Sequence, residues 1–221
     1  MSGASNFVES VDTAFWVVTV ISVFFLVLIT FLMVFFVVKY NKKRNPKATN
    51  IHGNVPLEVA WTVIPTLLVL VMFWYGWVAY KQMADAPEDS MIVDVTAQMW
   101  KWSFKYQNGV QADTLYVPLK KDVKLNLHSL DVNHAFFVPA FRLKKDVIPN
   151  RNNHAWFNAE EPGSYTITCA EYCGLNHSNM YSEVVVLPED EFNSWLSSHA
   201  KTDSLNQNNV SSKIDSLKNQ N

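Results

Sequence analysis

Two cysteines, a histidine and a methionine lie close together in one short segment of the chain. The 221 residues include 2 cysteines, Cys169 and Cys173, and His177 and Met180 follow them at short intervals. Thiolate, imidazole and thioether groups are soft ligands, and such a set selects copper over calcium or magnesium. A single blue copper ion would need one cysteine, two histidines and a weak axial methionine. The second cysteine therefore indicates a site in which two metal ions share the sulfur atoms.

Two other roles are open to these cysteines, a disulfide and a zinc site. On the outer side of a membrane, a cysteine pair is ordinarily a disulfide. Closing so short a loop would stabilise the fold by only about 2 kcal/mol in the chain-entropy model. A disulfide would also give no role to His177 or Met180. Zinc prefers cysteine, histidine and carboxylate ligands. Copper accounts for more of these residues than either alternative.

The pattern Cys-x-Glu-x-Cys-Gly-x-x-His-x-x-Met, which begins at Cys169, resembles the binuclear copper (CuA) signature of cytochrome c oxidase subunit II. The resemblance implies that Cys169 and Cys173 bridge two copper ions. It also implies that His177 and the backbone carbonyl of Glu171 complete one copper, while Met180 and a histidine from elsewhere complete the other. The Glu171 side chain would bind a magnesium ion at the interface with subunit I.

The remaining copper ligand must come from another part of the chain. The sequence has 6 histidines, at positions 52, 128, 134, 154, 177 and 199. His134 lies in Asp131-Val-Asn-His-Ala-Phe-Phe-Val-Pro, which resembles the Asp-Val-x-His segment of the family. The resemblance implies that His134 is the ligand, and the alternative is a core histidine that only bonds the backbone. We expect His128 and His154 to be structural, since no family motif surrounds them.

An aromatic segment at residues 98–106 resembles the one that precedes the copper site in the family. The resemblance implies that Trp100 is the tryptophan through which electrons arrive, from a c-type cytochrome that docks near Trp100 and Asp131. Lys101 and Lys105 stand where relatives often carry a tyrosine and an acid. These positive charges would weaken docking of a very basic cytochrome c.

Residues 143–151 resemble a family loop, Leu-Lys-x-Asp-x-x-Pro-Gly-Arg, that faces subunit I. Asp146 and Arg151 are therefore interface candidates. Asn150 replaces the glycine of that loop, and asparagine is among the residues that accept a positive φ.

Two long apolar runs predict a pair of membrane-spanning helices. Hydrophobic residues make up 49% of the chain, and the runs Ala14–Val38 and Val59–Tyr80 each suffice to cross a bilayer. Pro65 is expected near the start of the second helix, where proline is tolerated. Basic residues between the runs, at positions 39, 42, 43, 44 and 47, place residues 39–58 in the cytoplasm. Both termini and the copper domain would then be extracytoplasmic, at a bacterial inner membrane or, alternatively, a mitochondrial one.

Glu58 lies at the cytoplasmic edge of the second span, in a segment that resembles the Glu-x-x-Trp-Thr-x-x-Pro motif of the family. A carboxylate there would interact favourably with the positive end of the helix dipole. The resemblance adds that this glutamate stands at the entrance of a proton channel in the partner subunit. Both roles are open, because one residue can serve both.

Short alternating strands separated by turn residues predict an all-β sandwich after the second span. The expected strands are Met91–Ala97, Val123–His128, Trp156–Asn158, Ser164–Thr168 and Tyr181–Leu187, followed by a helix over Pro188–His199. The resemblance implies a cupredoxin-like Greek-key fold. We predict a transmembrane hairpin over 1–86, a copper domain over 88–200 and a polar flexible tail over 201–221. No Cys-x-x-Cys-His motif occurs, so no c-type haem is expected on this chain.

The resemblance implies that the chain is subunit II of a respiratory haem–copper oxidase. It would accept electrons from cytochrome c at CuA and pass them to haem in subunit I, where oxygen reduction is coupled to proton transport. Other oxidase subunits and the lipid bilayer are expected partners, and nothing indicates nucleic acid. A quinol-oxidase subunit would lack the copper ligands. The hairpin and the Glu58 segment argue against a nitrogen-oxide reductase. A disulfide-stabilised receptor domain is the alternative without redox chemistry.

Overall fold

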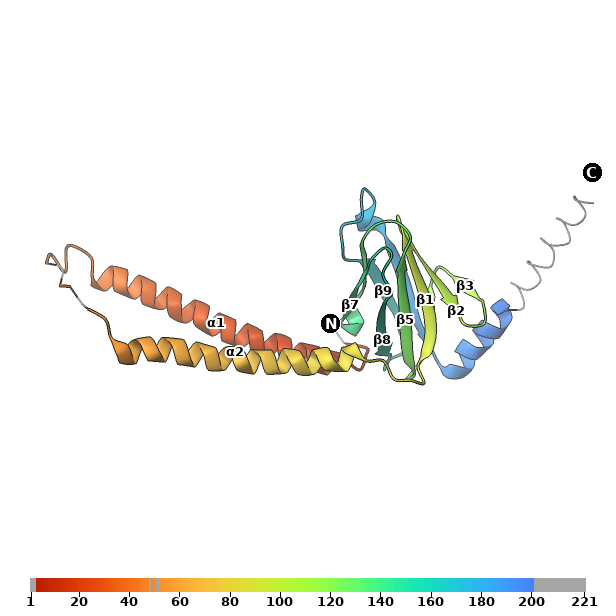
Figure 1. Ribbon diagram of the computed structural model, residues 1–221, viewed down its shortest axis with the longest axis horizontal. Helices are drawn as coiled ribbons and strands as arrows, with labels where there is room; N and C mark the ends of the chain where they lie inside the picture. The colour runs from red at the N-terminus through yellow and green to blue at the C-terminus, as the bar shows by residue number, and fades with distance from the viewer. Residues whose placement is uncertain (1–2, 48, 51, 201–221) are drawn as a thin grey trace, which may run out of the picture. The chain divides into compact units, whose positions relative to one another are not determined.

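The computed structural model describes residues 3–47, 49–50 and 52–200. The chain folds as two compact units (Figure 1). One comprises Glu9–Gln82 and contains most of two long helices, while the other joins Met1–Val8 to Met83–Asn221 and contains the sheets. The tail predicted at 201–221 lies outside the described residues.

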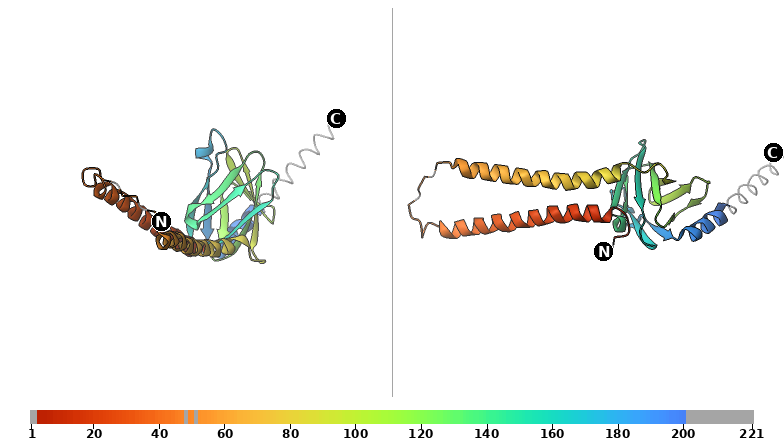
Figure 2. Two further views of the ribbon diagram at one scale, coloured as in Figure 1. Left: turned by 60° about the vertical axis from the view of Figure 1, so that its left-hand side comes forward. Right: turned by 90° about the horizontal axis from the view of Figure 1, so that it is seen from below.

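Two long helices dominate the first unit, α1 over Val8–Lys39 and α2 over Val55–Ala84. They run in opposite directions and are joined through residues 40–54 (Figure 2). Within the described part of the chain, these two helices are long and apolar enough to cross a membrane. The predicted spans are therefore confirmed as helices, and each helix extends beyond the predicted limits at both ends.

The start of α2 is fixed by side-chain capping. The Asn54 side-chain oxygen accepts a hydrogen bond from the Leu57 N–H at 3.2 Å, and the Glu58 carboxylate accepts one from the Asn54 N–H at 3.3 Å. Such reciprocal bonds satisfy N–H groups that have no partner within the helix. Pro56 falls in the first turn, where its missing N–H is harmless. Placing Pro65 near the helix start was wrong, because α2 begins earlier and Pro65 lies in its interior.

The second unit is a sandwich of two five-stranded sheets. The first sheet has the order β3 (Gln111–Ala112), β2 (Lys101–Tyr106), β1 (Met91–Gln98), β5 (Asp122–Ser129), β8 (Asn153–Asn158). The second has the order β4 (Leu115–Pro118), β10 (Tyr181–Leu187), β9 (Gly163–Cys169), β6 (His134–Val138), β7 (Leu143–Val147). Neighbours are antiparallel except β1 with β5 and β4 with β10. The predicted cupredoxin-like sandwich is confirmed.

Period-two alternation explains why these segments form strands around a core. In β5, Val123, Leu125 and Leu127 are buried, while the residues between them are more exposed. In β10 of the opposite sheet, Val184 and Val186 are buried in the same way. Successive side chains of a strand point to opposite faces, so each sheet turns one apolar face to the other. The result is a rigid frame whose strand ends hold the loops.

Part of the predicted subunit-facing loop is a strand. Residues 143–147 form β7, which pairs with β6, so the description of 143–151 as one loop was wrong. Leu143 and Val147 are buried while Lys144 and Asp146 are exposed, which is the alternation of an edge strand. Asn150 has φ of 58°, which confirms the expected positive φ.

The segment before α1 packs on the sandwich. Ser5 forms an antiparallel bridge with Ala159, and its hydroxyl donates to the Phe141 carbonyl at 2.8 Å. Phe7 is 1% exposed and meets Trp156 edge-on, with ring centroids 4.9 Å apart. Residues far apart in sequence therefore complete one edge of the sandwich unit.

The helix predicted over Pro188–His199 is present at residues 189–200. Trp195 stacks on Tyr116 with ring centroids 4.3 Å apart, and Phe192 is buried. Its aromatic side chains anchor the helix to the sandwich, and Lys121 forms an ion pair with Glu189 at 3.5 Å.

Candidate metal centre

The cysteine segment forms the connection from β9 to β10. β9 ends at Cys169, Met180 directly precedes β10, and a 3-10 turn at His177–Asn179 lies between them. β6 begins at His134 and pairs with β9, so that Phe136 lies opposite Cys169. Because the two strands are neighbours, the histidine that begins one lies close to the sulfur that ends the other.

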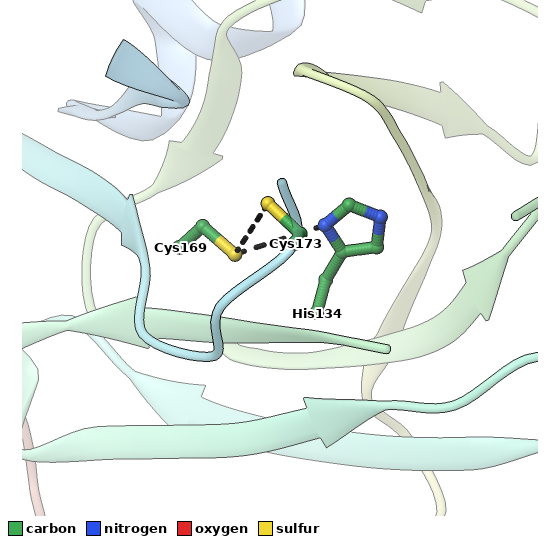
Figure 3. A group of neighbouring side chains, drawn as sticks. All are labelled: His134, Cys169 and Cys173. Atoms are coloured by element: carbon green, nitrogen blue, oxygen red, sulfur yellow. Dashed lines mark hydrogen bonds between the residues drawn. The ribbon is translucent and has the colours of Figure 1, made fainter. Parts of the chain in front are cut away.

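His134, Cys169 and Cys173 form a buried cluster (Figure 3). The Cys169 Sγ lies 3.8 Å from the Cys173 Sγ and 3.7 Å from the His134 Nδ1. A disulfide would bring the sulfur atoms to about 2.05 Å. Both cysteines are therefore free thiols in the structure.

The other predicted copper ligands surround the same sulfur atoms. The Cys173 Sγ lies 3.5 Å from the His177 Nδ1 and 3.8 Å from the Met180 Sδ. The backbone oxygen of Glu171 lies 3.2 Å from the Cys169 Sγ. The fold thus brings together every group that the sequence predicted to bind copper.

Asp131 orients the ring of His134. The His134 Nε2 lies 2.8 Å from the Asp131 Oδ1, which leaves the Nδ1 facing the sulfur atoms. The Asp131 carboxylate also accepts the N–H groups of Met99 and Val132, each at 2.6 Å. Partial burial works against ionisation of Asp131, but these hydrogen bonds outweigh it and lower the pKa of its carboxyl. A carboxylate behind a ligating histidine fixes the ring and raises its basicity.

This positioning role was missed in the sequence, where Asp131 was predicted only as a docking residue. The available signal was the Asp-x-x-His spacing, because a turn of that length returns the carboxylate to the histidine ring.

Burial keeps the Cys173 thiol protonated. Removal from water raises the pKa of Cys173 to about 11, and its hydrogen bond with Cys169 adds to the effect. A protonated thiol is a poor metal ligand, so binding of a cation here must release protons. The positive charge of the bound cation would then balance the negative charge of the deprotonated sulfur atoms.

The chemistry of this donor set fits copper. Two thiols, two imidazole nitrogens, a thioether and a carbonyl oxygen face one small volume. Zinc sites seldom use a thioether, whereas copper accepts it as a weak ligand. The thioether of Met180 is fully buried, and its sulfur faces the Cys173 Sγ. A copper site can use this thioether as a ligand, whereas a zinc site would leave it without a role.

Trp100 connects the molecular surface to the cysteine loop. Its ring is half-buried, and its Nε1 donates to the Cys173 carbonyl at 3.3 Å. Gly174 has φ of 118°, and a Cβ at that position would lie 3.3 Å from the Trp100 ring. Only glycine allows both the backbone conformation and this close approach. Trp102 and Phe104, which follow on β2, are buried in the core of the sandwich.

The remaining predicted residues lie away from the sulfur cluster. His128 and His154 are exposed on the outer face of the β1–β5–β8 sheet, beside a shallow pocket of about 310 Å³. Asp146 and Arg151 are exposed at and beyond the end of β7, as an interface role requires. Glu58 belongs to the first turn of α2 and caps that helix.

Comparison with known proteins matches both units of the chain to one family. The pattern described as "Cytochrome C oxidase subunit II, periplasmic domain" matches residues 66–187. The pattern described as "Cytochrome C oxidase subunit II, transmembrane domain" matches residues 2–76. Together they match residues 2–187, which include both long helices and all ten strands of the described chain.

Relatives and a solved structure agree with this match. The chain is 35% identical over 183 residues to cytochrome c oxidase subunit 2 of Alkalihalophilus pseudofirmus, covering 77% of this chain and 54% of that protein. It is 29% identical to the Synechocystis subunit 2, covering 89% of this chain and 74% of that protein. The chain thus spans about half the length of the first relative. The crystal structure of the periplasmic domain of subunit II of cytochrome oxidase (CoxB) of Bradyrhizobium japonicum superposes with a TM-score of 0.51 and 29% identity, covering 53% of this chain and 99% of that domain.

The structure agrees with these matches. It contains a hairpin of two apolar helices and a cupredoxin-like sandwich, and a cluster of sulfur and imidazole groups lies at the strand ends and loops of that sandwich. The chain belongs to the cytochrome c oxidase subunit II family.

Proposed function

We propose that this chain is the subunit that receives electrons for a respiratory haem–copper oxidase. It takes one electron at a time from a reduced c-type cytochrome and passes it to haem in subunit I, where oxygen is reduced and protons are transported. The observation that carries the proposal is the convergence of His134, Cys169, Cys173, His177 and Met180 on one buried volume, with the Glu171 carbonyl beside it. When bound there, a copper pair supplies a one-electron carrier.

The residues of the chain hold this carrier and limit its movement. Cys169 and Cys173 lie between the two histidines, and these four residues would together hold the metals. Asp131 fixes the ring of His134 from behind. Ligands held by hydrogen bonds on strand ends change position little, which keeps the surrounding geometry suited to both redox states. Trp100 provides a bonded link from the surface to the backbone of Cys173.

The side of the loop that carries Glu171 is proposed to face subunit I. Its side chain is exposed and free to reach a magnesium ion shared with that subunit. Asp146 and Arg151 are exposed and would contribute polar contacts to the same partner.

Two features support the proposed membrane topology. The basic connection between the helices favours the cytoplasm. Ala4 to Phe7 pack on the sandwich, which supports placing the N-terminal segment and the copper domain on one side of the membrane. We propose that this side is the periplasm of a bacterial inner membrane. The limits proposed for the domains, 1–86, 88–200 and 201–221, stay predictions.

Glu58 is proposed to serve the entrance of a proton channel in addition to capping α2. Its carboxylate is exposed at the cytoplasmic start of the helix, where protons would be drawn. The bond from the Asn54 N–H supports the structural role by itself, so the channel role needs a separate test.

Rapid mixing of the assembled oxidase with a reduced c-type cytochrome tests the proposed function. Absorbance of the copper pair should change before that of the haem in subunit I. A Cys173→Ser variant, with its bridging sulfur removed, should lose this first phase. Direct reduction of haem at an unchanged rate in that variant would contradict the proposal.

A further inference from the structure

The polar pocket on the outer face of the first sheet is separate from the sulfur cluster. It has a volume of about 310 Å³ and is lined by residues of β1, β5 and β8 and by Asn152. The lining side chains include two imidazoles, of His128 and His154, and the carboxylate of Asp94. The thiols of the buried cluster face other histidines, so the copper site leaves these two without a role.

The strand register places the three side chains close together. Asn126 on β5 pairs with His154 on β8 and with Asp94 on β1. His128 follows Asn126 by two residues, so it lies on the same face of the sheet and is the diagonal neighbour of both. Across an antiparallel pair such as β5 and β8, diagonal neighbours are about 7–8 Å apart, within reach of long side chains. Because a zinc–nitrogen bond is about 2.0–2.1 Å long, rotation of exposed side chains is enough to bring both imidazoles onto one ion.

Hydrogen bonds around the pocket leave acceptor atoms available for a cation. The His154 Nε2 lies 3.2 Å from the Ala84 carbonyl oxygen, so in the neutral ring Nε2 carries the proton and Nδ1 keeps its lone pair. Histidines that bind metals commonly donate their other N–H to a backbone carbonyl in this way. The Asn126 amide donates to the Asp94 Oδ1 at 2.9 Å and leaves its own oxygen as an acceptor.

Two lysines near the pocket limit how tightly a cation can bind. Lys124 lines the pocket, and Lys105 lies opposite Asp94 on β2. No ion pair joins either lysine to Asp94 in the part of the chain that the structure describes. The flexible stem of a lysine lets its ammonium group move into water, but the positive charge still opposes a bound cation. We therefore expect a weaker and more readily exchanged site than the buried cluster.

We propose that His128, His154 and Asp94 form a second metal site, on the surface of the sandwich, which binds one zinc ion with water completing the coordination. Two imidazoles, one carboxylate and a water are a ligand set that zinc uses elsewhere. Calcium and magnesium prefer oxygen ligands, so they would not use the two imidazoles. The site is independent of the electron-transfer role proposed above. A bound ion would also fix the His154 ring and its hydrogen bond to Ala84.

Calorimetric titration of zinc into the full chain in detergent tests this site. The buried cluster is first loaded with copper, and EDTA followed by gel filtration then removes ions from the surface. Copper(II) at the surface site would leave in the same step, because imidazole also suits copper. Copper contents measured after that step therefore report the buried cluster alone.

The unaltered chain should bind one zinc ion. His128→Ala and His154→Ala should each weaken zinc binding about tenfold or more, since each removes a nitrogen ligand. Lys124→Gln removes a positive charge beside the ion and should tighten binding about twofold or more. His199→Ala is the matched control, because His199 is also exposed but lies on the helix at residues 189–200. It should leave zinc affinity unchanged.

Electron paramagnetic resonance of the bound copper provides the second measurement. The spectrum should be the same in every variant and should not change as zinc is added, which shows that the variants are folded and that zinc stays outside the buried cluster. Three results would overturn the inference. They are a dissociation constant for zinc above about 1 mM, unchanged zinc affinity in the two histidine variants, and loss of the copper spectrum as zinc binds.

Discussion

Replacing Asp131 with asparagine should loosen the copper site without removing a ligand. The carboxylate lies 2.8 Å from the His134 Nε2 and 2.6 Å from each of the N–H groups of Met99 and Val132. Asparagine keeps one acceptor oxygen but no charge. Loss of hydrogen bonds to a charged group removes about 1.5–3 kcal/mol of stability. Loss of the carboxylate behind a ligating histidine lowers metal affinity about 10–100-fold.

Competition titration with a copper chelator, on the full chain in detergent, measures that affinity. Asp94→Asn is the matched control, because Asp94 also bonds a side chain, the Asn126 amide at 2.9 Å, but on the outer face of the sheet. It should leave copper affinity unchanged. Equal copper affinity in Asp131→Asn and the unaltered chain would refute the positioning role, whatever happens to stability.

The contribution of Asp131 to the stability of the fold should depend on pH in a defined direction. The hydrogen bonds lower the pKa of Asp131 in the folded state below the unfolded value of about 3.9. Ionised Asp131 therefore stabilises the fold above that value, and the contribution is lost as pH falls through the folded pKa. The stability difference between the unaltered chain and Asp131→Asn should be full at neutral pH and shrink under acid conditions, as denaturant titrations can show.

Five further substitutions test the roles assigned to other residues. His134→Ala should lower copper content in metal analysis, whereas His128→Ala should not, because His134 lies beside the Cys169 thiol and His128 is exposed on the outer face of the sheet. Trp100→Ala should slow electron arrival in rapid mixing and leave the copper spectrum nearly unchanged. Normal kinetics in a folded variant would show that electrons do not enter through Trp100. Phe7→Ala should destabilise the sandwich by about 3–5 kcal/mol in denaturant titrations, since the ring is 1% exposed. Glu58→Gln should lower steady-state turnover and its sensitivity to cytoplasmic pH, with copper content normal; turnover equal to the unaltered oxidase across the pH range would leave only the capping role.

The sequence was sufficient to predict most of the site because its ligands occur in short motifs. Cys169 to Met180 lie in one loop, so their proximity follows from chain connectivity alone. Placing His134 beside them required the resemblance, since the contact depends on pairing of β6 with β9, and no periodicity encodes which strands are neighbours. Asp131 was missed as a positioning residue because its effect depends on a turn that folds its carboxylate back onto the histidine.

Packing between distant segments was the least predictable part of the fold. Ser5 and Phe7 precede a helix and carry no strand pattern, yet they join the sandwich through a β-bridge, a hydrogen bond from the Ser5 hydroxyl and an aromatic contact. β7 was taken for a loop because a five-residue edge strand with three charged residues resembles a polar connection. Pro65 was placed at a helix start because apolar runs do not show capping, which Asn54 supplies upstream.

Electron paramagnetic resonance of the copper-loaded, oxidised full chain tests the central claim most directly. Two cysteine sulfur atoms 3.8 Å apart, flanked by two histidines, predict a pair of copper ions that share one unpaired electron. The spectrum should show hyperfine splitting from two equivalent copper nuclei, and metal analysis should give two coppers per chain. A signal confined to one copper nucleus, with one copper bound per chain, would contradict the account.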